Sequence, residues 1–443
     1  MIIVEFFRAY DSRSMKESRN HRSLCDSADV VVLGAGPAGL LLGNLLLAAG
    51  IDCVVLERAA RLHVQTRARA GFLAPNTVRI LDRHGLADGL HRDGRTHGTC
   101  EFRTADGRFR LDYGTLGRRE QHTVYPQQNL VTDLLTRYLD AGGRIRFHTE
   151  ALAVHDADGA RPHVTTREPD GRPTRWDARY VAGCDGRHGA ARRSLPPGAL
   201  RHHHDLGVSW LGLLAEAPPS LDAVGYAVHD RGFAGHMARS PQVTRYYLEC
   251  PRGASADAWS EERIWDELDL RMRAAEHGPL RRGPIIERGV VDLACDVVEP
   301  LRHGSLLLAG DAASLTAPAA AKGANLAVLE AEILAGALAE ALTGGDDAAL
   351  DRYSAQCLAY IWRAQEFTQW MTGLLHATPG QDRSGGSFFH ASLRRARLDS
   401  LRTSRAHQDW FAENYVCLSY TSEYTSAAAP VPTVGRRKIK KKN

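Results

Sequence analysis

The hydrophobic pattern is strongest between residues 29 and 58, where the chain reads DVVVLGAGPAGLLLGNLLLAAGIDCVVLER. Two short, continuous apolar runs, at 29–33 and 52–56, predict buried parallel strands. The apolar stretch at 38–49 between them is long enough to form a helix. This order of strand, helix and strand predicts a βαβ unit and therefore an α/β fold with a parallel sheet.

The turn between the first strand and the helix carries a glycine motif. Gly34, Gly36 and Gly39 form G-x-G-x-x-G, and Glu57 ends the second strand 18 residues after Gly39. The glycines permit a tight turn, close approach of a pyrophosphate and close packing of helix on strand. A carboxylate at the end of the second strand accepts hydrogen bonds from an adenosine ribose. The unit is therefore predicted to bind a dinucleotide.

Two later segments favour a flavin over a nicotinamide as that dinucleotide. In YVAGCDGRHGAARRSL, an apolar strand from Tyr180 ends beside Asp185, and in GSLLLAGDAASLTAPAAAKGANLAVLEAEILAGAL a strand at 306–309 ends beside Asp311. Asp311 is placed to accept a hydrogen bond from a ribityl hydroxyl. The amides of Gly323, Ala324 and Asn325 open a helix whose positive end would stabilise negative charge on a reduced flavin.

The composition is typical of a soluble globular protein and gives little evidence for a nucleic-acid partner. The 443 residues are 44% hydrophobic and 24% charged, and the net charge is +4. Six of the positive charges lie in the last eight residues, so the chain before Arg436 has 50 basic and 52 acidic residues. The basic excess therefore belongs to a tail and is weak evidence for nucleic acid. Lys322 is the only lysine between Lys16 and that tail.

The cysteines and the N-terminus predict a cytoplasmic protein. Eight cysteines lie scattered without C-x-x-C spacing, which is typical of reduced thiols. Glu5 and Arg8 interrupt the apolar start, so we expect no signal peptide, and no apolar run is long enough for a membrane helix. The histidines at 202–204 look like part of a loop, and adjacent side chains do not converge on one ion, so no metal site is expected.

With these motifs in order, the chain resembles the group A flavin-dependent aromatic hydroxylases, and within them the 4-hydroxybenzoate 3-hydroxylases. The resemblance covers about residues 29–420 and includes RARAGFLAPNTVRILDRHGL, TVYPQQNLVTDLL, WLGLLAEAPP and AENYVCLSY. It implies a Rossmann-like FAD domain interwoven with a β-sheet substrate domain and a helical C-terminal region, usually in a homodimer.

The implied ranges are a flexible extension at 1–28, an FAD-binding domain at 29–200, a substrate domain at 201–315, a helical FAD and interface region at 316–422, and a basic disordered tail at 423–443. The resemblance also implies hydroxylation of an aromatic acid with O2, through a flavin C4a-hydroperoxide. The electrons would come from NADPH or NADH, and because the sequence has no second dinucleotide motif, that donor is expected to dock on a groove. The residues expected to contact the cofactors are Gly34, Gly36, Gly39, Glu57, Arg58, Arg67, Arg69, Gln127, Asp185, Asp311, Lys322, Gly323, Ala324 and Asn325.

The implied catalytic residues form a proton relay. Tyr226, Tyr415 and His97 match the tyrosine that touches the substrate oxygen, a second tyrosine, and a histidine nearer solvent. Removing the phenol proton makes the ring electron-rich enough to accept an electrophilic oxygen, and histidine suits proton transfer near neutral pH. The relay is therefore expected to carry the proton from the buried phenol to solvent.

The implied substrate pocket both matches and departs from the family. Arg239 matches the arginine that pairs with the substrate carboxylate, Tyr247 matches a tyrosine at that end, and the carbonyl of Pro318 would face the substrate hydroxyl. Met237 stands where the family has a serine that donates to the carboxylate. Small residues replace larger or more polar ones near the ring, at Val228, Gly235, Ala317, Ala319 and Ala320.

The extra room favours 4-hydroxybenzoate or a substituted analogue such as 3-amino-4-hydroxybenzoate as the substrate. Other flavoprotein activities on a phenolic metabolite, those of a halogenase or an oxidase, stay open as alternatives, although the W-x-W-x-I-P pattern of halogenases is absent. A non-enzymatic FAD-binding protein is the alternative from a different class. An NAD-dependent dehydrogenase would leave the segments at Asp185 and Asp311 unexplained.

Overall fold

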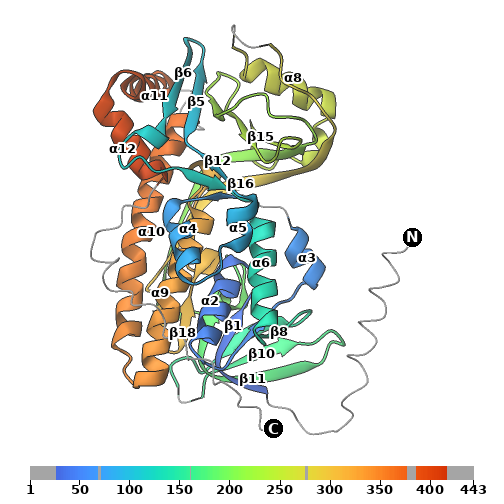
Figure 1. The fold of residues 1–443 in the computed structure, drawn as a ribbon, viewed down its shortest axis with the longest axis vertical. Helices are drawn as coiled ribbons and strands as arrows, with labels where there is room; N and C mark the ends of the chain where they lie inside the picture. The colour runs from blue at the N-terminus through green and yellow to red at the C-terminus, as the bar shows by residue number, and fades with distance from the viewer. Residues whose placement is uncertain (1–25, 68–70, 160, 275–277, 377–385, 417–443) are drawn as a thin grey trace, which may run out of the picture.

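The computed structural model describes residues 26–67, 71–159, 161–274, 278–376 and 386–416. Arg69 and nearly all of the predicted N-terminal extension and basic tail lie outside these residues. Two large sheets organise the fold, one in the lower and one in the upper part of the molecule in Figure 1, and long helices run beside them. No helix in the described part of the chain is both long and apolar enough to cross a bilayer.

The lower sheet contains the predicted βαβ unit, which confirms the α/β core. Strand β1 lies between β11 and β2, parallel to both, and β2 is in turn parallel to β8. The residues of β2 and of the second half of β1 are buried, as expected for a parallel sheet covered on both faces. The strands are β1 (Asp26–Leu33), β2 (Cys53–Leu56), β8 (Arg144–Arg146), β9 (Glu150–His155), β10 (His163–Arg167), β11 (Pro173–Gly183), β17 (Arg302–His303) and β18 (Leu306–Leu308).

Helices pack around this sheet and supply much of its hydrophobic core. Helix α2, between β1 and β2, contacts both α9 and α6, so segments that lie almost 300 residues apart in the chain meet at the fingerprint. The helices of this part are α2 (Pro37–Ala48), α3 (Arg61–Thr66), α4 (Pro75–Arg83), α5 (Asp88–Asp93), α6 (Gln127–Asp140), α7 (Ala190–Arg193), α9 (Gly323–Gly344) and α10 (Ala348–Leu375).

The upper sheet is mostly antiparallel, with the order β19-β16-β12-β15-β14-β13-β5-β6. Strands β5 and β6 come from the N-terminal half of the chain, and β13 pairs with β5 in parallel. The two sheets therefore exchange segments, which confirms the interwoven architecture. The strands are β5 (Thr99–Thr104), β6 (Gly107–Asp112), β12 (Leu200–Ala215), β13 (Val224–Ala227), β14 (Ala234–Ala238), β15 (Thr244–Cys250), β16 (Ile285–Glu299) and β19 (Ser314–Leu315).

The expected loop at the histidine triplet is wrong, because residues 202–204 belong to β12. Paired with β16, His202 lies opposite Val297 and His203 opposite Asp296. The Nδ1 atom of His203 lies 2.7 Å from the Asp296 carboxylate, and Nε2 of His202 lies 3.1 Å from Glu299. A polar run can therefore form a strand here, because the partner strand supplies acidic side chains.

The remaining elements lie around the junction of the two sheets or cover the upper sheet. One of these is a small third sheet with the strand order β3-β7-β4, formed by β3 (Phe72–Leu73), β7 (His122–Val124) and β4 (Arg95–His97). The other elements are α8 (Glu261–Arg271), α11 (Gly386–Thr403), α12 (Arg405–Val416) and the 3-10 helices η1 (Tyr113–Thr115), η2 (Ala256–Ala258), η3 (Gly310–Ala312) and η4 (Pro318–Ala320).

Candidate active site

The three glycines of the fingerprint have different surroundings. Gly34 has a φ of +94°, and a Cβ there would lie 2.6 Å from the carbonyl oxygen of Cys184. A Cβ on Gly39 would collide with the carbonyl oxygen of Gly34, whereas open space lies beside Gly36. These positions correspond to the tight turn, the contact of helix on strand and the close approach of a phosphate. The structure therefore fits a bound dinucleotide at the N-terminus of α2.

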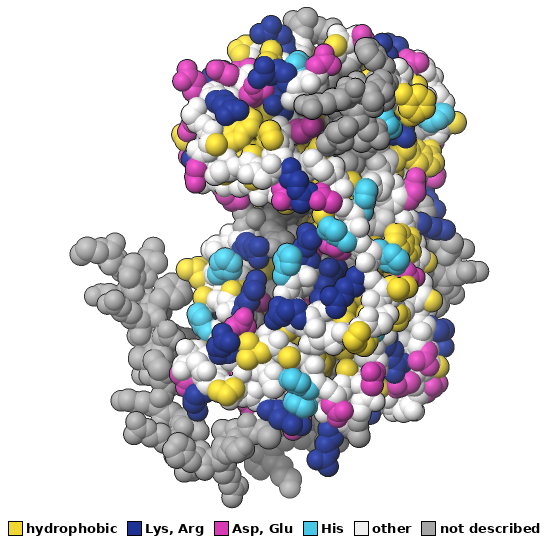
Figure 2. Space-filling model, turned by 180° about the vertical axis from the view of Figure 1, so that it is seen from behind, with side chains coloured by type: hydrophobic (Ala, Val, Ile, Leu, Met, Phe, Trp, Pro, Cys, Tyr) yellow, Lys and Arg dark blue, Asp and Glu magenta, His cyan; other side chains and the backbone are white. Residues whose placement is uncertain are grey.

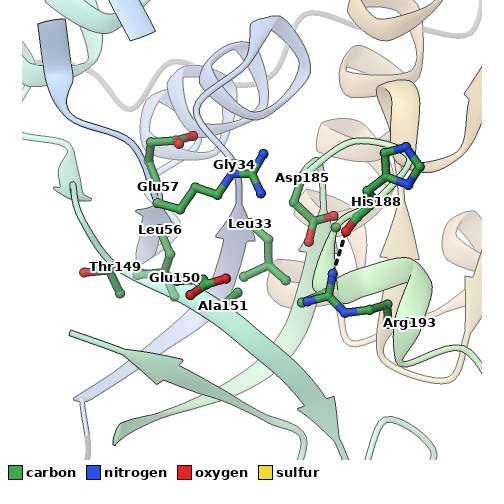
Figure 3. A pocket seen from close by; sticks show the side chains of 13 residues that line it. Leu33, Gly34, Leu56, Glu57, Thr149, Glu150, Ala151, Asp185, His188 and Arg193 are labelled. Atoms are coloured by element: carbon green, nitrogen blue, oxygen red, sulfur yellow. Dashed lines mark hydrogen bonds between the residues drawn. The ribbon is translucent and has the colours of Figure 1, made fainter. Parts of the chain in front are cut away.

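Glu57 lies where the motif requires it. Its two carboxylate oxygens accept hydrogen bonds from the backbone N–H groups of Ala35 (2.8 Å) and Ala59 (2.7 Å). These bonds fix the carboxylate beside the glycine turn and leave lone pairs for ribose hydroxyls. Figure 3 shows Glu57 on one side of a pocket and Asp185 on the other, with Leu33 at the end of β1 and the following Gly34 between them. Arg58 also lines this pocket.

Asp185 lies on the opposite wall of that pocket. Its carboxylate accepts a hydrogen bond from the Ala191 N–H at 3.0 Å, and burial raises the pKa of the group. Nearby, Arg193 donates to the carbonyl of His188, so a cationic side chain also lies on this wall (Figure 3). The structure thus brings Gly34, Glu57, Arg58 and Asp185, all expected cofactor contacts, into one pocket.

The backbone on either side of Asp311 is held by two side chains that the sequence motifs did not indicate. Asp311 lies in η3, and the neighbouring Gly310 N–H donates to the Glu330 carboxylate at 2.6 Å. Arg192 donates through Nε to the carbonyl of Ala312 at 2.6 Å, although burial lowers the pKa of this guanidinium. Glu330 and Arg192 therefore fix the backbone on either side of Asp311. The sequence signal that could have found Glu330 is a carboxyl side chain within an otherwise apolar helix.

Glu330 predicts a pH dependence of stability. Burial raises its pKa from 4.5 to about 8. Because the unfolded state loses this proton first, the free energy of unfolding should fall as pH rises from 4.5 to 8, by about 2–4 kcal/mol. Glu330→Gln should remove this loss and leave a holoenzyme more resistant to urea at pH 8. Urea unfolding midpoints at pH 5 and pH 8 check it.

The exposed Glu340 on the same helix provides the control. Glu340→Gln should keep the pH dependence of the wild-type protein. If Glu330→Gln and Glu340→Gln change the pH dependence equally, the buried carboxyl is not its source.

Asn325, a predicted cofactor contact, uses its side chain for hydrogen bonds within the protein. The side chain of Asn325 accepts from the Ala74 N–H (2.8 Å) and the Thr77 hydroxyl (2.7 Å), and donates to the carbonyls of Phe72 and Ala321. It thereby ties the start of α9 to the chain between β3 and α4. The backbone amides of Gly323, Ala324 and Asn325 lie at the N-terminus of α9, as expected.

Lys322 is almost fully buried, with 2% of its surface exposed. Its Nζ donates to the carbonyls of Asn414 (2.6 Å) and Tyr415 (2.9 Å), near the C-terminus of α12, where a positive charge is favourable. The lone internal lysine therefore holds Tyr415, one of the predicted relay residues, in place. The sequence had placed this lysine beside the flavin and gave no sign of its contact with α12.

The relay tyrosines meet although 189 positions separate them in the chain. The hydroxyls of Tyr226, on β13, and Tyr415, on α12, lie 2.6 Å apart, and both side chains are buried. Burial raises the pKa of each well above 10. Met237, Tyr247 and Val228 pack in the same hydrophobic cluster, together with Ala319 and Ala320. These five predicted pocket residues therefore share one hydrophobic cluster with the tyrosine pair.

His97 lies farther from this pair. In the described part of the chain no hydrogen bond joins it to Tyr415; its Nδ1 atom instead lies 3.0 Å from the hydroxyl of Tyr113. The Tyr113 ring packs edge-on against that of Tyr415, with centroids 5.1 Å apart. Burial lowers the pKa of His97, so this histidine is neutral near pH 7. Sequence reasoning missed Tyr113, which no motif marks.

The carboxylate end of the predicted pocket is positively charged. Arg239 follows β14, and burial and the nearby Arg245 both lower the pKa of its guanidinium. Arg245 is itself buried and lies 3.7 Å from Glu287. Two guanidiniums held close together favour an anion, because an anion relieves their repulsion.

The other predicted contacts occupy varied positions. Gln127 begins α6, Arg67 caps the C-terminus of the short α3 and is exposed, and Pro318 begins η4 with its ring exposed. The Pro318 carbonyl accepts the N–H of Ala321 at 3.0 Å. For these three residues a contact with cofactor or substrate stays a prediction.

Comparison with known proteins identifies the family. A family model described as an FAD binding domain matches residues 27–368. The chain is 37% identical over 392 residues to p-hydroxybenzoate hydroxylase of Acinetobacter baylyi, an alignment covering 88% of this chain and 95% of that protein. The chain therefore belongs to the FAD-dependent aromatic hydroxylases, the class that its fold and site define.

Other relatives differ in the aromatic compound that their names give. The chain is 30% identical to 3-amino-4-hydroxybenzoate 2-monooxygenase of Streptomyces cremeus, over 73% of this chain and 82% of the relative. The crystal structure of p-nitrophenol 4-monooxygenase from Pseudomonas putida shares the fold with a TM-score of 0.75 at 20% identity, and covers 89% of this chain and 100% of the other. The crystal structure of a ternary complex of aklavinone-11 hydroxylase with FAD and aklavinone has a TM-score of 0.67 at 24% identity. The match covers 83% of this chain and 71% of that chain.

Proposed function

We propose that this flavin-dependent hydroxylase acts on a 4-hydroxybenzoate-type acid, either 4-hydroxybenzoate or a substituted analogue such as 3-amino-4-hydroxybenzoate. The observation that carries the proposal is the pairing of the Tyr226 and Tyr415 hydroxyls in one hydrophobic cluster with Met237 and Tyr247. Similarity to p-hydroxybenzoate hydroxylase over nearly the whole chain supports it. FAD, reduced by NADPH or NADH, supplies the activated oxygen when bound.

The protein side chains have three tasks in this reaction. Arg239 binds the carboxylate, so that the ring is oriented with its phenol toward Tyr226. Tyr226 accepts a hydrogen bond from the phenol and passes its proton toward Tyr415. The surrounding apolar side chains exclude water, which strengthens these polar interactions. Ionised substrate then has the electron-rich ring carbon that hydroxylation requires.

The electron donor needs a site outside the FAD pocket. Figure 2 shows arginine side chains gathered with histidines in the middle of one face, below the narrowing between the two parts of the molecule. Such a positively charged face attracts the phosphates of a pyridine nucleotide. We propose that NADPH or NADH docks transiently on this face. We also propose that the enzyme is cytoplasmic and forms a homodimer.

Purified holoenzyme tests the proposed function. It should be yellow with bound FAD, and NAD(P)H oxidation should accelerate with 4-hydroxybenzoate or 3-amino-4-hydroxybenzoate and give a hydroxylated product. Benzoate lacks the phenol and phenol lacks the carboxylate, so each should give little product. Oxidation that yields only peroxide with both acids would exclude them as substrates, and halogenation or simple oxidation of a phenol would favour the alternative flavoprotein activities.

Met237 gives a prediction about affinity. Met237→Ser would add a hydroxyl donor beside the carboxylate site, and a neutral hydrogen bond contributes about 0.5–1.5 kcal/mol. The dissociation constant for 4-hydroxybenzoate should therefore fall by about 2–10-fold, measured by the change in flavin absorbance on titration. Met237→Ala removes the same apolar side chain without adding the donor and provides the control. Equal affinities of the two variants would contradict the assigned position.

A further inference from the structure

The hydroxyl of Tyr113 lies between two histidines beside the tyrosine pair. Tyr113 is fully buried in η1, and its oxygen lies 3.0 Å from His97 Nδ1 and 3.4 Å from His122 Nδ1. It also donates a hydrogen bond of 2.7 Å to the backbone carbonyl of His97. The rings of Tyr113 and His122 each pack edge-on against the Tyr415 ring at 5.1 Å. None of these contacts is part of the predicted relay.

The local chain forces this arrangement. Strands β4 and β7 pair with His97 directly opposite His122, and Gly114 N–H donates to the carbonyl of Gly98 at 2.9 Å. A Cβ on either Gly98 or Gly114 would lie 2.7 Å from the Gln121 amide nitrogen. The Gln121 side chain packs against both glycines, and the Gly114–Gly98 hydrogen bond ties η1 to the residue after β4, which keeps the Tyr113 hydroxyl against His97.

The single hydrogen of the Tyr113 hydroxyl determines which ring nitrogen of neutral His97 is protonated. A tyrosine hydroxyl has one hydrogen, and a carbonyl oxygen can only accept, so the hydrogen lies toward the His97 carbonyl. The contact from His97 Nδ1 must then be a donated N–H. Neutral His97 therefore carries its hydrogen on Nδ1, and its Nε2, which makes no hydrogen bond to the described residues, keeps a lone pair that can accept a proton.

The surroundings of His97 keep its resting state neutral. Burial lowers its pKa, Arg110 acts in the same direction, and Asp222 opposes them. From β7 it faces His122, whose pKa burial and the charge of Lys322 lower well below 6.5. From η1 it faces Tyr113, whose pKa is raised by burial. Near neutral pH the neighbouring histidine and tyrosine therefore add no charge.

We propose that Tyr113 is a positioning residue of the proton relay, which holds His97 as the Nδ1–H tautomer so that Nε2 takes up the proton that leaves the substrate phenol. The proposal rests on the proposed function of the Tyr226–Tyr415 pair. The phenol loses one proton, His97 gains it at Nε2, and His97 then releases it to water. Tyr113 keeps its own proton throughout.

The tautomer can be measured without substrate. In holoenzyme labelled with 15N-histidine, long-range 1H–15N spectra should show His97 with a protonated Nδ1 and a bare Nε2, the signals being assigned by their loss in His97→Gln. In Tyr113→Phe the Nδ1–H form should no longer dominate. Tyr246 is an equally buried tyrosine whose hydroxyl contacts Ser220, and Tyr246→Phe should leave the His97 signals unchanged. An Nε2–H tautomer in the wild-type protein would overturn the proposal.

Proton release gives the functional measurement. When 4-hydroxybenzoate is mixed with holoenzyme in weak buffer containing a pH indicator, Tyr113→Phe should release the phenol proton at least about tenfold more slowly. If Tyr113 acts through His97, the double variant Tyr113→Phe/His97→Gln should release the proton no more slowly than His97→Gln alone. If the rate reductions of the two single variants multiply in the double variant, the proposal is overturned. If neither 4-hydroxybenzoate nor 3-amino-4-hydroxybenzoate perturbs the flavin spectrum, the proposed function is wrong, and the tautomer measurement still decides the role of Tyr113.

Discussion

Tyr226→Phe should slow formation of hydroxylated product by about 100-fold or more while leaving FAD bound. The substitution removes the hydroxyl that lies 2.6 Å from that of Tyr415, so the buried phenol loses its route for the proton. A positioned proton-transfer group typically contributes about 10²–10⁴-fold. The rate of product formation is the measurement, with NAD(P)H oxidation and peroxide followed in parallel. NAD(P)H oxidation that stays rapid while product falls would show that electrons still reach oxygen.

The phenylalanine keeps the ring contacts of Tyr226 with Phe102 and Phe233, so the fold should survive. Tyr246→Phe provides a matched control, because this buried tyrosine belongs to a separate hydrophobic cluster. Normal hydroxylation by Tyr226→Phe would remove Tyr226 from the relay. An equal loss in both variants would point to a general effect on the sheet.

Arg239→Ala should weaken binding of 4-hydroxybenzoate by about 30-fold or more. Removing one partner of a buried charge pair typically costs about 2–5 kcal/mol, much of which comes from leaving the other charge unpaired. Arg239→Lys keeps the charge but loses the planar fork, so its affinity should lie between those of the wild-type enzyme and the alanine variant. Dissociation constants from flavin absorbance titrations provide the measurement.

Phenol is the matched ligand, because it lacks the carboxylate that Arg239 is proposed to bind. Its weak affinity should be nearly the same in the wild-type enzyme and in Arg239→Ala. If both ligands lose affinity equally, Arg239 supports the pocket rather than the carboxylate. If neither changes, the neighbouring Arg245 becomes the candidate for the carboxylate site.

Local sequence was sufficient to predict the dinucleotide unit. The run at 29–33 lies in β1, the run at 52–56 contains β2 at Cys53–Leu56, and the helix predicted at 38–49 is α2 at Pro37–Ala48. Gly34, Gly36, Gly39 and Glu57 belong to one short segment, so their spacing alone determines their arrangement. The histidines at 202–204 show the limit, because their strand depends on acidic partners in β16, almost 100 residues later.

The contacts between distant segments needed the tertiary structure. The family resemblance indicated Tyr226 and Tyr415, but their 2.6 Å contact depends on how α12 packs against the upper sheet. Lys322 was singled out by its rarity, yet its partners are carbonyls at the end of α12. Tyr113 has no sequence signal, since a tyrosine in a short turn after a strand is ordinary until two histidines surround its hydroxyl.

The sequence by itself determined that this protein has an FAD-binding α/β core, because the glycines, the apolar strands and the acid at the strand end act within one continuous stretch of chain. Only the tertiary structure decided which polar groups support that core and the tyrosine pair, namely Glu330, Arg192, Lys322 and Tyr113. The physical reason is that a hydrogen bond depends on distance and direction between two atoms. For residues far apart in the chain, packing sets both.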